Sequence, residues 1–167
     1  MSPPKRKLQL ETLEPRELMS VSSIGNFVGV VRDGQNWFLS GDQTSANAAQ
    51  IRSFGQPGDR YLSGDWNSDG RIDLIAVRAN AEGGLTWNVD TDGDLKADIQ
   101  HKYGLASDQP FVGDWNGDRK LDLGVARRNS QSGGMDWYLD TTRVPYANPP
   151  ARQFGLIGDT PVVGDWD

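Results

Sequence analysis

Residues 64–78 read GDWNSDGRIDLIAVR, a polar acidic loop that runs directly into a short apolar segment. Oxygen-bearing side chains occupy places 1, 3, 5 and 9 after the first glycine: Asp65, Asn67, Asp69 and Asp73. Alternate side chains of a tight loop point inward, so these oxygens can converge on one hard cation such as Ca²⁺. Gly70 stands at place 6, where a sharp turn favours glycine, and Arg71 at place 7 offers its backbone carbonyl. This spacing predicts a calcium site.

The loop departs from an EF-hand beyond its ninth place. An EF-hand requires a carboxylate at place 12, and this position is Ala76. A short, β-branched apolar run bounded by turn residues follows, which indicates a buried strand: Ile72, Leu74, Ile75, Ala76 and Val77. The alternative to a metal site is a turn in which Asp and Asn side chains cap their own backbone. We therefore expect a calcium-like loop on a β framework.

The whole chain after residue 23 repeats this pattern with a period of about 50 residues. The GDW triplet begins at residues 64, 113 and 164, and a second set of tryptophans has the same period: Trp37, Trp87 and Trp137. Aromatic–glycine pairs begin at Phe54, Tyr103 and Phe154. One position per repeat predicts that the tryptophans occupy a core or blade-packing position, and the alternative is a set of aromatic platforms for sugar rings.

Each repeat has room for four short strands, which is the pattern of a propeller blade. We predict an all-β fold of about three blades, each with four antiparallel strands. The predicted units are a degenerate blade at 24–63, blades at 64–112 and 113–163, and the start of a further repeat at 164–167.

The repeated words, FG followed by GD and then GDWNGDxxxDLxVxR, resemble the FG-GAP or VCBS repeat of integrin-like propellers and bacterial surface proteins. The resemblance covers residues 24–167. It implies a non-catalytic β-propeller whose blades hold calcium in an inter-strand loop, and a role in adhesion. We transfer the calcium role only to loops whose residues match.

Two further loops are candidates for Ca²⁺. The first offers Asp114, Asn116, Asp118, Asp122 and the carbonyl of Lys120. Arg119 takes its glycine position, which predicts backbone strain and cation repulsion. The second, DTDGDLKAD, contains Asp90, Asp92, Asp94 and Asp98, and its alternative is a solvated acidic hairpin. The corresponding segment after Asp140 has lost its acids and is expected to bind no cation. Arg78 and Arg127 end strands beside these loops and are expected to pair with the acids.

Residues 1–23 contain a basic start and no apolar run long enough for a secretory core or a membrane span. Residues 10–20, LETLEPRELMS, resemble the LEPR-type motif on exported planctomycete proteins. That resemblance implies an export segment at 1–23 and an extracellular or cell-envelope location. The alternative is a disordered basic tail.

Charge and composition restrict the function further. Residues 24–167 carry 13 basic and 20 acidic groups, which argues against nucleic-acid binding and favours cation binding. The chain has no cysteine, one histidine (His101) and no Gly-x-Ser-x-Gly motif, so we predict that it is not an enzyme.

The combined prediction is a calcium-stabilised extracellular module that binds a protein or a glycan. The alternatives are an ancillary domain of an extracellular polysaccharide-acting enzyme and a structural cell-envelope protein. Closed propellers usually contain about four to eight blades. Three blades therefore predict either self-association, with two chains completing one ring, or a truncated gene product.

Overall fold

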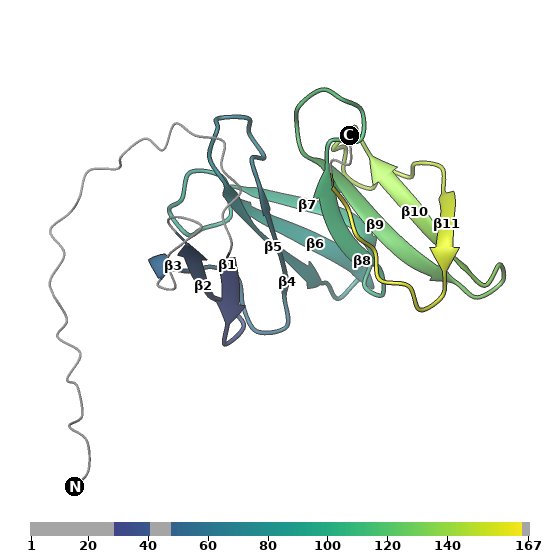
Figure 1. Ribbon diagram of the computed structural model, residues 1–167, viewed down its shortest axis with the longest axis horizontal. Coiled ribbons are helices and arrows are strands. Elements are labelled where there is room, and N and C mark those ends of the chain that lie inside the picture. The colour runs from purple at the N-terminus through teal and green to yellow at the C-terminus, as the bar shows by residue number, and fades with distance from the viewer. Residues whose placement is uncertain (1–28, 41–47, 165–167) are drawn as a thin grey trace, which may run out of the picture.

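The computed structural model describes residues 29–40 and 48–164, and within these ranges the chain is all-β, without any helix (Figure 1). Three antiparallel sheets contain all of its strands. The first sheet consists of β1 (Gly29–Arg32), β2 (Asn36–Ser40) and β3 (Ala48–Ser53). The middle sheet consists of β4 (Arg60–Gly64), β5 (Asp73–Ala79), β6 (Gly84–Asp90) and β7 (Ile99–Leu105). The third sheet consists of β8 (Gln109–Gly113), β9 (Asp122–Asn129), β10 (Gly134–Asp140) and β11 (Arg152–Leu156).

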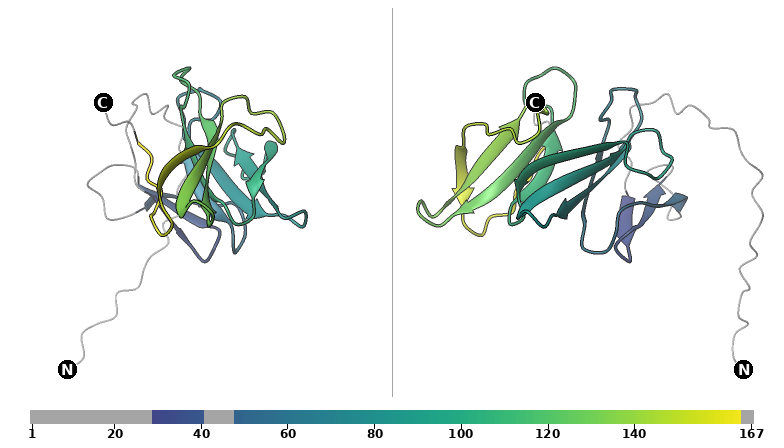
Figure 2. Two further views of the ribbon diagram at one scale, coloured as in Figure 1. Left: turned by 90° about the vertical axis from the view of Figure 1, so that its right-hand side faces the viewer. Right: turned by 180° about the vertical axis from the view of Figure 1, so that it is seen from behind.

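The three sheets lie in a row along the molecule in chain order. This row is visible from the front in Figure 1 and from behind in Figure 2. Strands within each sheet are also in chain order, so every sheet is a meander joined by hairpins. This arrangement confirms the predicted all-β fold of blade-like sheets. No helix in the described part of the chain is long and apolar enough to cross a membrane.

Sheet limits differ slightly from the predicted blade limits. The limits at 63/64 and 112/113 fall inside β4 and β8, because the strand before each GDW pairs with the strand after the acidic loop. Gly64 lies opposite Asp73, and Gly113 lies opposite Asp122. Each of these acidic loops therefore connects the first and second strands of one sheet. The predicted export segment at 1–23, the first residues of the degenerate blade and residues 165–167 lie outside the described residues.

The repeated tryptophan lies on the next-to-last strand of each sheet and bonds to the last strand or to the residue directly after it. Its indole Nε1 donates to the carbonyl of the aromatic residue before glycine in all three units, over 2.8 to 3.0 Å: Trp37 to Phe54, Trp87 to Tyr103, Trp137 to Phe154. Trp37 and Trp87 are 5% and 0% exposed. They lie in the apolar clusters between neighbouring sheets. Burial of these two residues confirms the predicted packing role.

Candidate metal centres in the acidic loops

Three acidic loops, 65–73, 90–98 and 114–122, share one backbone conformation. Places 4 and 6 have positive φ in each loop: Ser68 and Gly70, Gly93 and Leu95, Gly117 and Arg119. The sequence pattern anticipated the turn at place 6 and missed the one at place 4. The strain predicted at Arg119 is present, since its φ is 67°. Serine and leucine adopt the same region in the other loops, so glycine is favoured at these places but is not essential.

The place-1 carboxylate holds each loop in this shape. It accepts hydrogen bonds from the backbone N–H of place 6 over 2.7 to 3.0 Å: Asp65 from Gly70, Asp90 from Leu95, Asp114 from Arg119. Its other oxygen accepts from place 4 or 5. Oxygens at places 3 and 5 each accept from the N–H two residues later. These contacts are the Asx-type turns expected if the loops bind no metal, and they also gather the acidic side chains on one loop.

The place-9 carboxylate closes each loop by accepting from the N–H of place 2: Asp73 from Trp66, Asp98 from Thr91, Asp122 from Trp115. Asp73 and Asp122 are buried, at 3% and 1% exposure. Burial raises the pKa of Asp73 from 3.8 to about 6, and it also raises the pKa of Asp122. Two buried carboxylates that are costly to ionise would each be stabilised by a bound cation.

Loop 90–98 brings its carboxylates closest together. One oxygen each of Asp90, Asp92 and Asp98 lie within 4.8 Å of one another, and no other three acidic or histidine side chains among the described residues converge in this way. The side chain of Asp94 lies instead 2.7 Å from the Lys96 Nζ. Hydrogen bonds from Thr91 lower the pKa of Asp98, so this carboxylate is ionised at neutral pH. The loop can therefore offer three converging carboxylates without moving its backbone.

The loops also contact one another. Asn67 Nδ2 lies 3.2 Å from Asp69 Oδ2 and 3.4 Å from the carbonyl of Thr91, which links loop 65–73 to loop 90–98. Ser68 Oγ lies 3.4 Å from the carbonyl of Arg119, which links it to loop 114–122. The three candidate sites therefore form one acidic edge across the middle and third sheets. The contributions predicted for the Arg71 and Lys120 carbonyls stay predictions.

The fourth segment, after β10, uses its remaining acid differently. Asp140 is 1% exposed and accepts from Thr142 and Arg143 within its own turn. Its other oxygen lies 3.8 Å from His101 Nε2 on the middle sheet. His101 is 5% exposed, and burial lowers its pKa. Sequence reasoning missed this pair, because nothing local indicates that β7 and β10 meet there.

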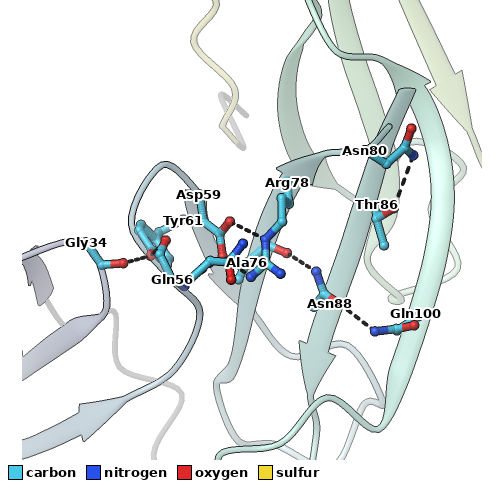
Figure 3. A network of polar contacts seen from close by, with 10 residues as sticks. All are labelled: Gly34, Gln56, Asp59, Tyr61, Ala76, Arg78, Asn80, Thr86, Asn88 and Gln100. Atoms are coloured by element: carbon cyan, nitrogen blue, oxygen red, sulfur yellow. Dashed lines mark hydrogen bonds and ion pairs between the residues drawn. The ribbon is translucent and has the colours of Figure 1, made fainter. Parts of the chain in front are cut away.

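The strand-ending arginines pair with acids other than those of the metal loops. Arg78 makes a bidentate ion pair with Asp59 at 2.7 and 2.8 Å (Figure 3). Arg127 makes the same pair with Asp108 at 2.8 Å. Both acids come from the turn that precedes the sheet. The expectation that both arginines pair with acidic residues is confirmed. The expectation that these acids belong to the metal loops is wrong. The recurring aspartate after each aromatic–glycine pair was the available signal.

Comparison of the chain with protein-family models, with curated proteins and with solved structures finds no match. The function is therefore inferred from the geometry of the loops and sheets.

Proposed function

We propose that this chain is a non-catalytic, calcium-stabilised binding module that acts outside the cell or in the cell envelope. Ca²⁺ would bind in the acidic loops and hold the hairpins of the middle and third sheets. The sheets would then present a rigid surface to a protein or glycan ligand in adhesion. The LEPR-like segment supports the location.

The observation that carries the calcium proposal is the convergence of Asp90, Asp92 and Asp98. Oxygen-only ligands at flexible spacing suit Ca²⁺, which accepts about six to eight oxygens in adaptable geometry. Loops 65–73 and 114–122 have the same backbone conformation and place a buried carboxylate at place 9. A common loop structure supports a common ligand. Loop 90–98 has the most acidic residues of the three, with four aspartates.

A calcium-dependent melt tests the metal. The protein is stripped with a chelator and melted with added Ca²⁺, with Mg²⁺ or with neither. A ligand that binds only the folded state raises the midpoint by mass action. We expect Ca²⁺ to raise it and Mg²⁺ to do so less, because Mg²⁺ demands a stricter octahedral geometry.

Variants identify the loop responsible. Asp92→Asn should remove most of the response of loop 90–98, and Asp69→Ala and Asp118→Ala should remove that of the other two. Glu82→Gln is the matched control, since Glu82 is an exposed acid outside the loops that pairs with Lys102. If added Ca²⁺ does not change the melting midpoint of the wild type, the acidic loops are turns and not calcium sites.

Isothermal titration tests the ligand class. Saturable heat with cell-wall glycans, lost when Ca²⁺ is removed, would support glycan binding. Absence of heat with every glycan, together with capture of a defined surface protein in Ca²⁺ alone, would assign a protein ligand.

A further inference from the structure

We propose that a second copy of this chain binds head to tail, with the third sheet of one chain docked on the first sheet of the other and residues 160–164 completing that first sheet. This inference goes beyond calcium binding and does not depend on it. Three separate features of the described residues carry it: a first sheet with one edge that no described strand covers, an uncovered sheet face, and an acid and an arginine that take part in no ion pair between described residues.

Within the described ranges, the first sheet lacks the strand that begins the other two. In the middle sheet β4 pairs with β5, and in the third sheet β8 pairs with β9. The counterpart of β5 and β9 in the first sheet is β1, because Val31 faces Trp37 as Val77 faces Trp87. Among the described strands β1 pairs with β2 only, so no described strand covers its other edge. An open edge of this kind is a template for a strand from another chain.

One described segment has the sequence of a first strand but belongs to no sheet. Residues 160–164 read TPVVG and align with QPFVG of β8 (Gln109–Gly113), each sharing its glycine with a GDW triplet. Residues 160–164 do not form a strand, and Val162 is 68% exposed. Transfer of the β8–β9 register places Thr160 opposite Val31, Pro161 opposite Val30 and Val162 opposite Gly29 of the receiving chain.

The third sheet exposes an aromatic residue whose equivalents in the other two sheets are covered. Phe54 and Tyr103 are 6% and 5% exposed, because the next sheet packs on them, whereas the equivalent Phe154 is 77% exposed. On the opposite side of each junction, the residue that faces the preceding sheet is buried in the middle and third sheets, where it is Ala76 and Val125. The equivalent residue of the first sheet, Val30, is 58% exposed. The third sheet and the first sheet therefore each expose an apolar face of the kind that is covered where two sheets of this chain meet.

Charge complementarity fixes the same register. Asp59 and Asp108 lie in the turns between sheets and bind Arg78 and Arg127 of the following sheet (Figure 3). Asp159 lies in the equivalent turn after β11, where it accepts from the Leu156 N–H over 2.9 Å, as Asp108 does from the Leu105 N–H.

The arginine that matches Asp159 in this scheme is Arg32 of the first sheet. Arg32 stacks on Phe38 at 4.6 Å, as Arg127 stacks on Tyr138 at 4.5 Å. Among the ion pairs between described residues, neither Asp159 nor Arg32 takes part. Docking of two chains would pair them as the two internal sheet junctions do.

This contact joins two different faces, so it is heterologous and repeats until it closes. Three sheets from each of two chains give six, which lies within the range of about four to eight blades in closed propellers. A ring of two chains would cover the exposed face of the third sheet and pair the outer edge of β1 in both copies.

The first test is the molar mass of the full chain by light scattering and by sedimentation over about a hundredfold range of concentration. We expect a species of twice the chain mass. Val30→Asp on the receiving face or Phe154→Asp on the docking face should each weaken association by at least about a hundredfold, because a charge is desolvated in the contact. Glu82→Gln should leave it unchanged.

Mixing the two variants is the decisive experiment. Val30→Asp keeps an intact docking face, and Phe154→Asp keeps an intact receiving face. An equimolar mixture should therefore form a one-to-one complex through one intact contact, with the ring open at the other, although neither variant associates alone. Both side chains are exposed in a single chain, so a circular-dichroism melt should show that each variant folds.

Two results would overturn the proposal. A wild-type chain that stays monomeric at every concentration would mean that another occupant covers these faces. Association that survives either variant, or a mixture that fails to recover it, would exclude the head-to-tail contact.

Discussion

Asp73→Asn separates the cost of burying a carboxylate from the benefit of binding a cation. Asp73 is 3% exposed, and burial raises its pKa from 3.8 to about 6. Asparagine keeps an oxygen to accept the Trp66 N–H and removes the charge. A raised pKa in the folded state contributes stability that is present below pH 3.8 and is lost as the pH rises through about 6. In calcium-free solution at pH 7 the ionised group therefore costs stability.

The size of that pKa change sets the expected effect. A pKa change of about 2 units corresponds to about 3 kcal/mol at about 1.36 kcal/mol per unit. Asp73→Asn should raise the free energy of unfolding by up to about 3 kcal/mol at about pH 7 in chelator, and by little at about pH 4. With Ca²⁺ at about 100 times its dissociation constant, the wild type should gain about 2.7 kcal/mol if one site binds. The variant should gain much less from loop 65–73.

Urea unfolding followed by tryptophan fluorescence measures both quantities in one preparation, with and without Ca²⁺. Asp122→Asn is the matched variant, since Asp122 has the same place and bond in loop 114–122. If Asp73→Asn lowers the stability of the calcium-free protein at pH 7, the burial argument is wrong. If it leaves the calcium response intact, Asp73 is not a ligand.

Three further predictions concern single positions. Arg119→Gly should raise the free energy of unfolding by about 1 kcal/mol, because it relieves positive φ, and denaturant midpoints of the variant and of Ser68→Gly would show whether the relief is general. His101 is the sole histidine, and burial lowers its pKa. The contribution of His101 to stability should therefore fall as the pH drops below about 6.5, and a His101→Gln variant with a pH profile identical to that of the wild type would contradict this. Trp87→Ala should cost about 3 to 5 kcal/mol, whereas Trp137→Ala in dilute monomer should cost less because its sheet is uncovered; equal losses in urea titrations would refute the difference.

Local chemistry was sufficient to predict much of this protein. A period of about 50 residues, four short strands per period and turn-forming residues between them predict antiparallel sheets without knowledge of any distant contact. Side chains of Asp and Asn bond to the backbone within a few residues, so the positions of Asp65, Asp90 and Asp114 in their loops were readable from spacing alone.

The tertiary structure decided what depends on contacts between sheets. The sequence spacing does not predict that Asp90, Asp92 and Asp98 converge while Asp94 pairs with Lys96. The rotamers of loop side chains depend on the residues that surround them in the folded structure. Similarly, the ion pair of Arg127 with Asp108 and the approach of His101 to Asp140 join separate hairpins. Periodicity determines which strands form and which face of each is apolar, but burial of that face requires a neighbour. Exposure of Phe154 and Val30, and therefore the proposed docking of a second chain, is a property of the packed sheets alone.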